Sequence, residues 1–161
     1  MKKLIFKIND AIYKVELFIG VSILVSIVFI VFLQVFNRFV LKQPLSWSEE
    51  LARYLFIILV FIGISVATKA KAHFGIDFII QKLGPRARNL VGTVIALGIL
   101  YFLWVVFSKS FLLINSAMTQ KSPAMGITMG YLYYTFPFFA AFAMVHIFTN
   151  LVEDLFGGDK G

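Results

Sequence analysis

Residues 46–69 read SWSEELARYLFIILVFIGISVATK, and this stretch decides the fold that we predict. Ser46 followed three residues later by Glu49 is typical of a capping box, in which each side chain satisfies a free backbone amide of the first turn. Pro44 disfavours helix on its N-terminal side, so a helix is predicted to begin near Trp47. The sequence thus predicts a helix whose first turns are charged and whose remainder is apolar.

The apolar part of this helix is short for a membrane span. Residues 54–68 carry no charge, and at about 1.5 Å per residue they cover about 22 Å of the ~30 Å hydrocarbon core. To span, the helix must also bring in Glu49, Glu50 and Arg53, which are costly near lipid unless they pair or face protein. Arg53 lies one turn from both acids. Two interpretations stay open: an interfacial salt bridge, or a cluster that organises a helix bundle or docks another membrane protein.

The composition indicates a polytopic membrane protein. Of the 161 residues, 60% are hydrophobic and 19 are Phe, and the mean hydropathy is +0.91, whereas soluble chains are roughly 45–50% apolar. We predict an all-α integral membrane protein that forms a single membrane domain. Its four transmembrane helices are expected at about residues 15–40, 47–70, 87–114 and 126–154, with a short interfacial helix at about 76–84 between spans two and three.

The sequence also excludes several classes of function. There are no cysteines, which rules out disulfides and thiolate metal sites. His73 and His146 lie far apart, and no HExxH, P-loop or GxSxG motif is present, so we expect neither an enzyme nor a cofactor in this chain. The net charge of +7 comes mainly from basic residues between spans, so membrane orientation explains it better than nucleic-acid binding.

Lysine and arginine divide unevenly between the two sides of the predicted bundle. With the N-terminus in the cytoplasm, ten of the 15 lie on the cytoplasmic side, including those between residues 69 and 88, and five lie opposite. The positive-inside rule therefore predicts that both termini are cytoplasmic. Residues 1–16 carry four lysines at the start of the chain. They predict a basic amphipathic lead-in that lies on an anionic leaflet.

Two groups of polar residues flank the second span. Gln34, Asn37 and Arg38 share one helix face, and we expect them to hydrogen-bond to a neighbouring helix, with solute binding as the alternative. His73 and Asp77 follow the span. A contact between them is expected to be structural, because no nucleophile or metal partner is nearby.

Small residues four positions apart recur in the predicted spans. Such pairs predict faces on which another helix approaches closely, with chance spacing as the alternative. The pairs are Gly63 and Ala67, Gly92 and Ala96, and Gly126 and Gly130. In the fourth span, Pro137 is expected to kink the helix or to mark where it becomes regular. His146 is predicted to be a hydrogen-bonded residue of the bundle.

Residues 44–78 also resemble a known family. The run PLSWSEELARYLFIILVFIGISVATKAKAHFGIDF is similar to the small, DctQ-like membrane subunit of tripartite ATP-independent periplasmic (TRAP) transporters. The resemblance in length and span pattern covers nearly the whole chain. The residues that carry it are Pro44, Trp47, Glu49, Glu50, Arg53, Tyr54, Phe61, Ile62, Gly63, His73 and Asp77, with Gln34, Asn37 and Arg38 upstream.

The resemblance implies a place in a larger assembly. In TRAP systems a small four-span subunit pairs with a large multi-span subunit in the bacterial inner membrane, and the large subunit holds the solute and sodium sites. A periplasmic solute-binding protein delivers an organic acid, often a dicarboxylate or a sialic-acid-like sugar acid. This chain would then be a scaffold in sodium-dependent symport, with sodium bound by the partner. The motif residues from Gln34 to Asp77 would serve structure or partner docking.

Two other functions were weighed. A self-sufficient small transporter acting as a homodimer would need an acidic residue at the middle of a span, and the sequence places none there. It would also be expected to carry an inverted repeat, and we find none. A membrane-bound enzyme would need a catalytic constellation, which the motifs above do not supply. We therefore favour the scaffold subunit and keep the homodimeric transporter as the alternative.

Overall fold

The computed structural model describes residues 2–70 and 85–156, and these are all-helical apart from an isolated bridge between Lys121 and Thr128. The helices are α1 (Lys2–Phe39), α2 (Ser46–Lys69), α4 (Pro85–Ala117), α5 (Met129–Tyr133) and α6 (Thr135–Phe156). Four stretches are long and apolar enough to cross a membrane: Phe6–Phe39, Ser46–Lys69, Leu90–Ala117 and Met129–Val152. The prediction of an all-α protein with four transmembrane helices is confirmed.

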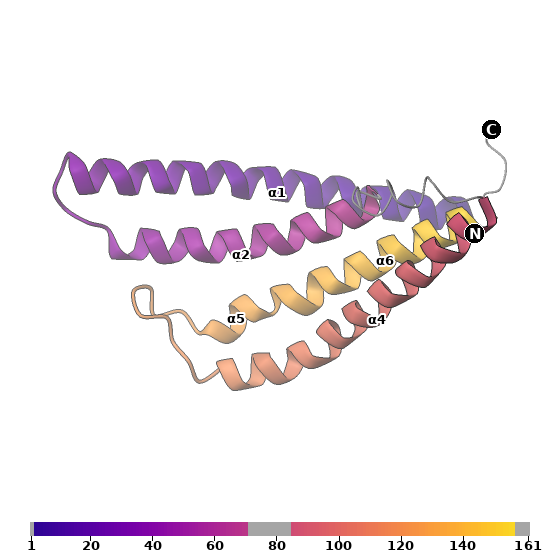
Figure 1. The fold of residues 1–161 in the computed structure, drawn as a ribbon. Coiled ribbons are helices and arrows are strands. Elements are labelled where there is room, and N and C mark those ends of the chain that lie inside the picture. The colour runs from indigo at the N-terminus through magenta and orange to yellow at the C-terminus, as the bar shows by residue number, and fades with distance from the viewer. Residues whose placement is uncertain (1, 71–84, 157–161) are drawn as a thin grey trace.

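The helices pack in the order α1, α2, α6, α4, and α1 also contacts α6 (Figure 1). The start of α1 and the end of α6 lie at one end of the bundle, which we call the terminal end. The links 40–45 and 118–128 lie at the opposite end, which we call the loop end. Consequently α1 runs antiparallel to α2, whereas α2 and α6 run in the same direction.

The interior of the bundle is small. A buried apolar cluster joins α4 to α6 and consists of Leu103, Ala140, Ala143 and Ile147. Between α1 and α2 the approach is close at Gly20, where an added Cβ would lie 3.2 Å from Ile62 Cγ2. Many large apolar side chains instead point outward, particularly along α1 and α4. This arrangement suits lipid or another membrane protein as the surroundings, because neither penalises exposed hydrocarbon.

The first helix differs from its prediction. We expected residues 1–16 to lie along the membrane surface as a separate lead-in, but α1 is one continuous helix from Lys2 to Phe39 (Figure 1). Asn9 and Glu16 are both buried on the bundle side of this helix. Their contacts with the rest of the bundle hold the first turns in line with the span, so the surface-lying lead-in was wrong.

The fourth span is broken near its start. Tyr134 separates α5 from α6, and Pro137 follows in the first turn of α6, where the missing amide proton costs nothing. The prediction that Pro137 marks the beginning of the regular helix is confirmed. Gly126, in contrast, lies in the 118–128 link with a φ of 69°. Gly126 and Gly130 therefore do not form a pair on one helix, and that prediction was wrong, because the turn requires a left-handed residue at Gly126.

The predicted interfacial helix at about 76–84 lies outside the described residues. His73 and Asp77 lie there too, and their expected contact stays a prediction.

Candidate functional site

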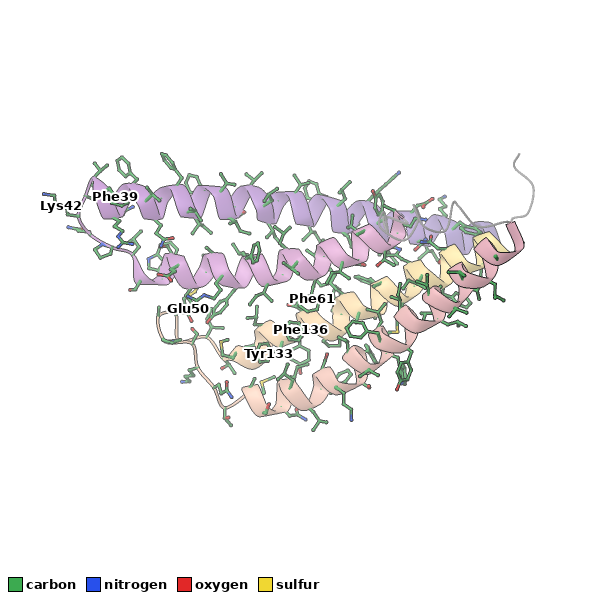
Figure 2. The ribbon with its side chains drawn as sticks, viewed as in Figure 1. Phe39, Lys42, Glu50, Phe61, Tyr133 and Phe136 are labelled. Carbon is green, nitrogen blue, oxygen red and sulfur yellow. The ribbon has the colours of Figure 1, made fainter. Side chains whose placement is uncertain are left out.

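Glu50 is the acidic residue around which the loop end is built (Figure 2). It lies in the first turns of α2, and only 7% of the residue is exposed. Its Oε2 accepts hydrogen bonds from the backbone amides of Ala124, at 2.8 Å, and Met125, at 3.0 Å. Its Oε1 accepts a hydrogen bond from the hydroxyl of Tyr54, one turn further along α2. We call these four residues the Glu50 anchor, because they fasten α2 to the 118–128 link.

The link that Glu50 holds is a compact turn. Ser122 is buried, its amide donates to the carbonyl of Ile127 at 2.8 Å, and its Oγ accepts from the amide of Ile127 at 3.2 Å. The backbone amide of Met129 donates a hydrogen bond to the backbone carbonyl of Gln120 at 2.9 Å. With the turn held in this way, the backbone amides of Ala124 and Met125 at its tip point towards α2. A carboxylate suits that position because ionised acceptors form stronger hydrogen bonds to backbone amides.

The predicted capping box is not formed. Leu45, not Ser46, is the N-cap of α2, and it makes no side-chain capping bond. Ser48 Oγ instead donates to the carbonyl of Leu45 at 2.7 Å. The helix begins one residue before the expected start, so Ser46 already lies in the first turn and the capping geometry is lost.

The two interpretations of the charged cluster apply to different residues. Arg53 Nη2 lies 3.3 Å from Glu49 Oε1, and the two side chains are 66% and 69% exposed. This salt bridge is exposed, and such exposed pairs contribute little to stability; its position at the membrane interface stays a prediction. Glu50 is the acid that organises the bundle, and its partners are a hydroxyl and two amides rather than Arg53.

The remaining motif residues gather at the loop end of α1 and α2. Arg38 is exposed, and its guanidinium carbon lies 5.9 Å from the ring centroid of Phe39. Asn37 Nδ2 donates a hydrogen bond to the carbonyl of Leu33, on the same helix, at 2.9 Å. The prediction that Asn37 bonds to a neighbouring helix was therefore wrong. Trp47 is exposed, and Gln34 is half-buried. A docking role for these residues stays a prediction.

The members of the three predicted small-residue pairs differ in how closely they are packed. An added Cβ on Gly63 or Gly92 would meet no atom within 4 Å in the part of the chain that the structure describes. Gly130, by comparison, is packed so closely that an added Cβ would lie 2.7 Å from Met118 Sδ, just beyond α4. Ala96 packs beside the apolar cluster of α4 and α6, whereas Ala67 is exposed. A role of Gly63, Ala67 and Gly92 in receiving a partner helix stays a prediction.

A second polar cluster, at the terminal end, was only partly anticipated. His146 on α6 is fully buried; its Nδ1 lies 2.5 Å from Asn9 Oδ1 and its Nε2 lies 2.9 Å from Glu16 Oε2. The prediction that His146 is hydrogen-bonded in the bundle is confirmed. Asn9 and Glu16 were missed, although their spacing of seven residues puts them on one helix face. The lysines near Asn9 and Glu16 instead led to the prediction that this segment lies on the membrane surface.

Two further bonds close the terminal end. Lys69 Nζ lies 3.1 Å from Asp10 Oδ1, which joins α2 to α1. Asn150 Nδ2 donates to the carbonyl of Thr68 at 2.9 Å, which joins α6 to α2. Polar contacts thus tie three helices together at this end, while the Glu50 anchor ties α2 to the link at the other.

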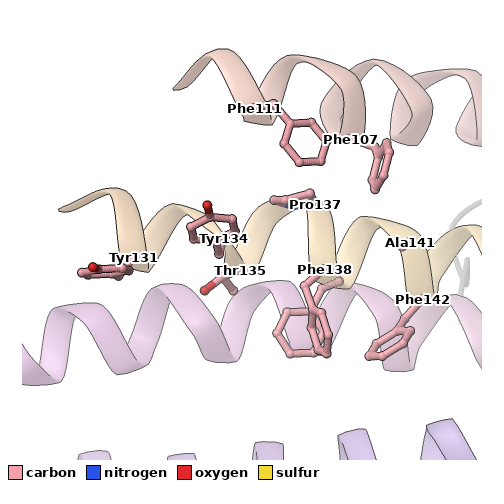
Figure 3. A pocket seen from close by; sticks show the side chains of 10 residues that line it. Phe107, Phe111, Tyr131, Tyr134, Thr135, Pro137, Phe138, Ala141 and Phe142 are labelled. Atoms are coloured by element: carbon pink, nitrogen blue, oxygen red, sulfur yellow. The ribbon is translucent and has the colours of Figure 1, made fainter. Parts of the chain in front are cut away.

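An open apolar groove of about 520 Å³ lies between α4 and the α5–α6 segment (Figure 3). Its lining is mostly aromatic and includes Phe107, Phe111, Tyr134, Phe138 and Phe142. Within residues 2–70 and 85–156, no group of three His, Cys, Asp or Glu side chains is placed to hold a metal ion. In the described part of the chain, the buried side chains of Glu16, Glu50 and His146 bond to other segments of the bundle.

Residues 27–157 match the family of the DctQ component of tripartite ATP-independent periplasmic transporters. The chain belongs to the DctQ family. DctQ-family proteins are transporter subunits, not enzymes, and this one is a multi-pass protein of the bacterial inner membrane with four apolar helices.

Three relatives show how this DctQ-family chain compares with known proteins. It is 26% identical to the sialic acid TRAP transporter small permease protein SiaQ of Vibrio cholerae, over 93% of this chain and 88% of the relative. It is 28% identical to a putative TRAP transporter small permease protein of Haemophilus influenzae, over 79% and 77%. It is 29% identical to the sialic acid TRAP transporter permease protein SiaT of Haemophilus influenzae, and the matched region covers 83% of this chain but only 22% of the relative.

Proposed function

We propose that this chain is the scaffold subunit of a TRAP transporter, paired with a large membrane subunit for sodium-driven uptake of an organic acid that a periplasmic binding protein delivers. The observation that carries the proposal is how the buried polar groups are used. Glu50, Glu16 and His146 all bond to other parts of the same bundle. A subunit built this way offers mainly apolar outer faces to its surroundings.

The partner is supported by the longer relatives. The chain spans 22% of SiaT and 22% of the isethionate TRAP transporter permease protein DctMQ of Oleidesulfovibrio alaskensis. In both, a segment similar to this chain is part of a much larger permease. Because segments of one polypeptide work together, this supports pairing of the present chain with a separate large subunit.

The substrate class is supported by the names of the relatives. These relatives are described as transporters of sialic acid, isethionate or C4-dicarboxylate, all of which are organic acids. We propose a dicarboxylate or a sialic-acid-like sugar acid for this system. Sodium is proposed to bind to the large subunit, and no cofactor is proposed for this chain.

Reconstitution in liposomes tests the proposal. Under an inward sodium gradient, the purified chain alone is expected to take up no organic acid, because the buried Glu50 and His146 bond to other parts of the bundle. Uptake is expected only when a large membrane subunit and a soluble binding protein are both added. Sodium-driven uptake by this chain alone would contradict the scaffold role and support a self-sufficient homodimeric transporter.

Two exposed tryptophans provide a matched pair for the docking motif in the same assay. Trp47 belongs to the motif at the loop end, whereas Trp104 lies on α4, and both are exposed. Trp47→Ala is expected to lower uptake and retention of the large subunit without changing the affinity of the binding protein for its solute. Trp104→Ala is expected to lower uptake and retention of the large subunit less than Trp47→Ala does. Equal effects would remove the special role of the motif.

We further propose that both termini are cytoplasmic, which the charge count favours and which is compatible with the start of α1 and the end of α6 lying at the same end of the bundle. The chain has no native cysteine, so single cysteines can be placed freely. In intact cells, cysteines replacing Gln43 or Gln120 at the loop end should react with an impermeant thiol reagent, and one replacing Lys3 should not. Labelling of Lys3→Cys with protection of the other two would reverse the orientation.

A further inference from the structure

Three buried polar atoms have no hydrogen-bond partner within the described part of the chain: Asn9 Nδ2, Glu16 Oε1 and Ser65 Oγ. The three residues are at most 1% exposed. A buried polar group without a partner is costly, and in a bundle surrounded by lipid no solvent reaches it from outside. Where two such atoms lie side by side, one small ligand can satisfy both.

The packing of α1 on α2 places two of these atoms at one level. Gly20 on α1 faces Ile62 on α2 at close range. Glu16 lies one turn before Gly20, and Ser65 lies one turn after Ile62. Because the two helices are antiparallel, these steps lead in the same direction. Glu16 and Ser65 therefore lie at the same height between α1 and α2.

The packing of α6 on α2 adds the third helix. Asn150 on α6 bonds to the carbonyl of Thr68 on α2. These helices run in the same direction, so one turn back along both places His146 at the height of Ser65. His146 itself contacts Glu16 and Asn9. The unpartnered atoms thus belong to residues around one buried imidazole, where α1, α2 and α6 meet.

The hydrogen-bonding capacities at this junction specify the ligand. Glu16 Oε1 accepts hydrogen bonds, and Ser65 Oγ can donate or accept them. A water molecule both donates and accepts, and buried waters typically make about three such bonds. A cation fits less well, because it needs more oxygen ligands than this set supplies.

We propose that the α1–α2–α6 junction is a binding site for a single buried water, which bridges Glu16 Oε1 and Ser65 Oγ. The water joins α2 to the Asn9–Glu16–His146 cluster, to which no α2 side chain is hydrogen-bonded within the described residues. This site is independent of the transport role proposed above, and its test needs no transport assay.

The sign of the effect of Ser65→Ala tests the site. If the hydroxyl had no partner, its removal would raise the thermal unfolding midpoint of the full chain or leave it unchanged. If it binds the water, its removal should lower the midpoint by about 2–4 °C. Ser26→Ala is the matched control, because Ser26 is exposed and bonds only to the carbonyl of Ser22 on its own helix. A midpoint for Ser65→Ala at or above that of the unsubstituted chain overturns the proposal.

Two further measurements separate the water from other ligands. A cryo-EM map of the chain in its complex, at a resolution that shows ordered solvent, should contain a peak about 2.6–3.2 Å from both Glu16 Oε1 and Ser65 Oγ. Replacing NaCl with choline chloride at constant ionic strength should leave the midpoint unchanged. Direct contact between the two side chains in the map, or a midpoint that rises only with sodium, overturns the water site.

Discussion

Replacing Glu50 with alanine is expected to loosen the loop end of the bundle more than any other substitution in the charged start of α2. The change removes the acceptor of the Ala124 and Met125 amides and of the Tyr54 hydroxyl. Hydrogen exchange at the two amides should become at least about tenfold faster, because the link then opens locally. The unfolding midpoint should fall by about 3–6 °C. Glu50→Gln should lie between alanine and the unsubstituted chain, because it keeps one oxygen acceptor.

The neighbouring charges provide the controls for Glu50. Glu49→Ala and Arg53→Ala break an ion pair whose two side chains are mostly exposed. Exposed pairs of this kind contribute about 0–1 kcal/mol, so both variants should keep the exchange rates of the Ala124 and Met125 amides. A larger loss with Arg53→Ala than with Glu50→Ala would show that the arginine, and not the amides, compensates the buried acid.

Replacing His146 with leucine is expected to be the most destabilising single change at the terminal end. It leaves Glu16 and Asn9 buried with none of their present bonds to α6. Leaving a buried polar group without its hydrogen-bond partner costs about 1–3 kcal/mol in the free energy of unfolding, and more if the group is charged. Denaturant unfolding of the purified chain in detergent would measure it.

The double variant provides the decisive comparison for His146. Replacing both partners of a buried hydrogen bond with apolar groups can be nearly neutral, so Glu16→Leu combined with His146→Leu should be more stable than His146→Leu alone. Glu49→Leu combined with His146→Leu is the matched control, because Glu49 is exposed and does not contact the histidine. If the two double variants behave alike, Glu16 and His146 are not energetically coupled.

The sequence by itself determined the class of the protein and the number of its spans. Length and hydropathy suffice for this, because a segment that crosses a bilayer must bury its backbone polar groups in its own helix. At Pro137, local chemistry left two alternatives, a kink or the start of the regular helix, and the structure decided for the start. Local chemistry sufficed at His146, since a polar ring in an apolar span needs a partner within the bundle.

The partners of the buried polar groups required the tertiary structure. Glu49 and Glu50 are neighbours with the same chemistry, but they point about 100° apart around the helix axis. Only the packing of α2 decides that Glu50 faces the bundle and Glu49 faces outward. The amides that Glu50 binds are more than seventy residues away in sequence. Asn9 and Glu16 are likewise more than a hundred residues from His146. No local pattern encodes contacts at such distances, because their energies arise only once the helices are assembled.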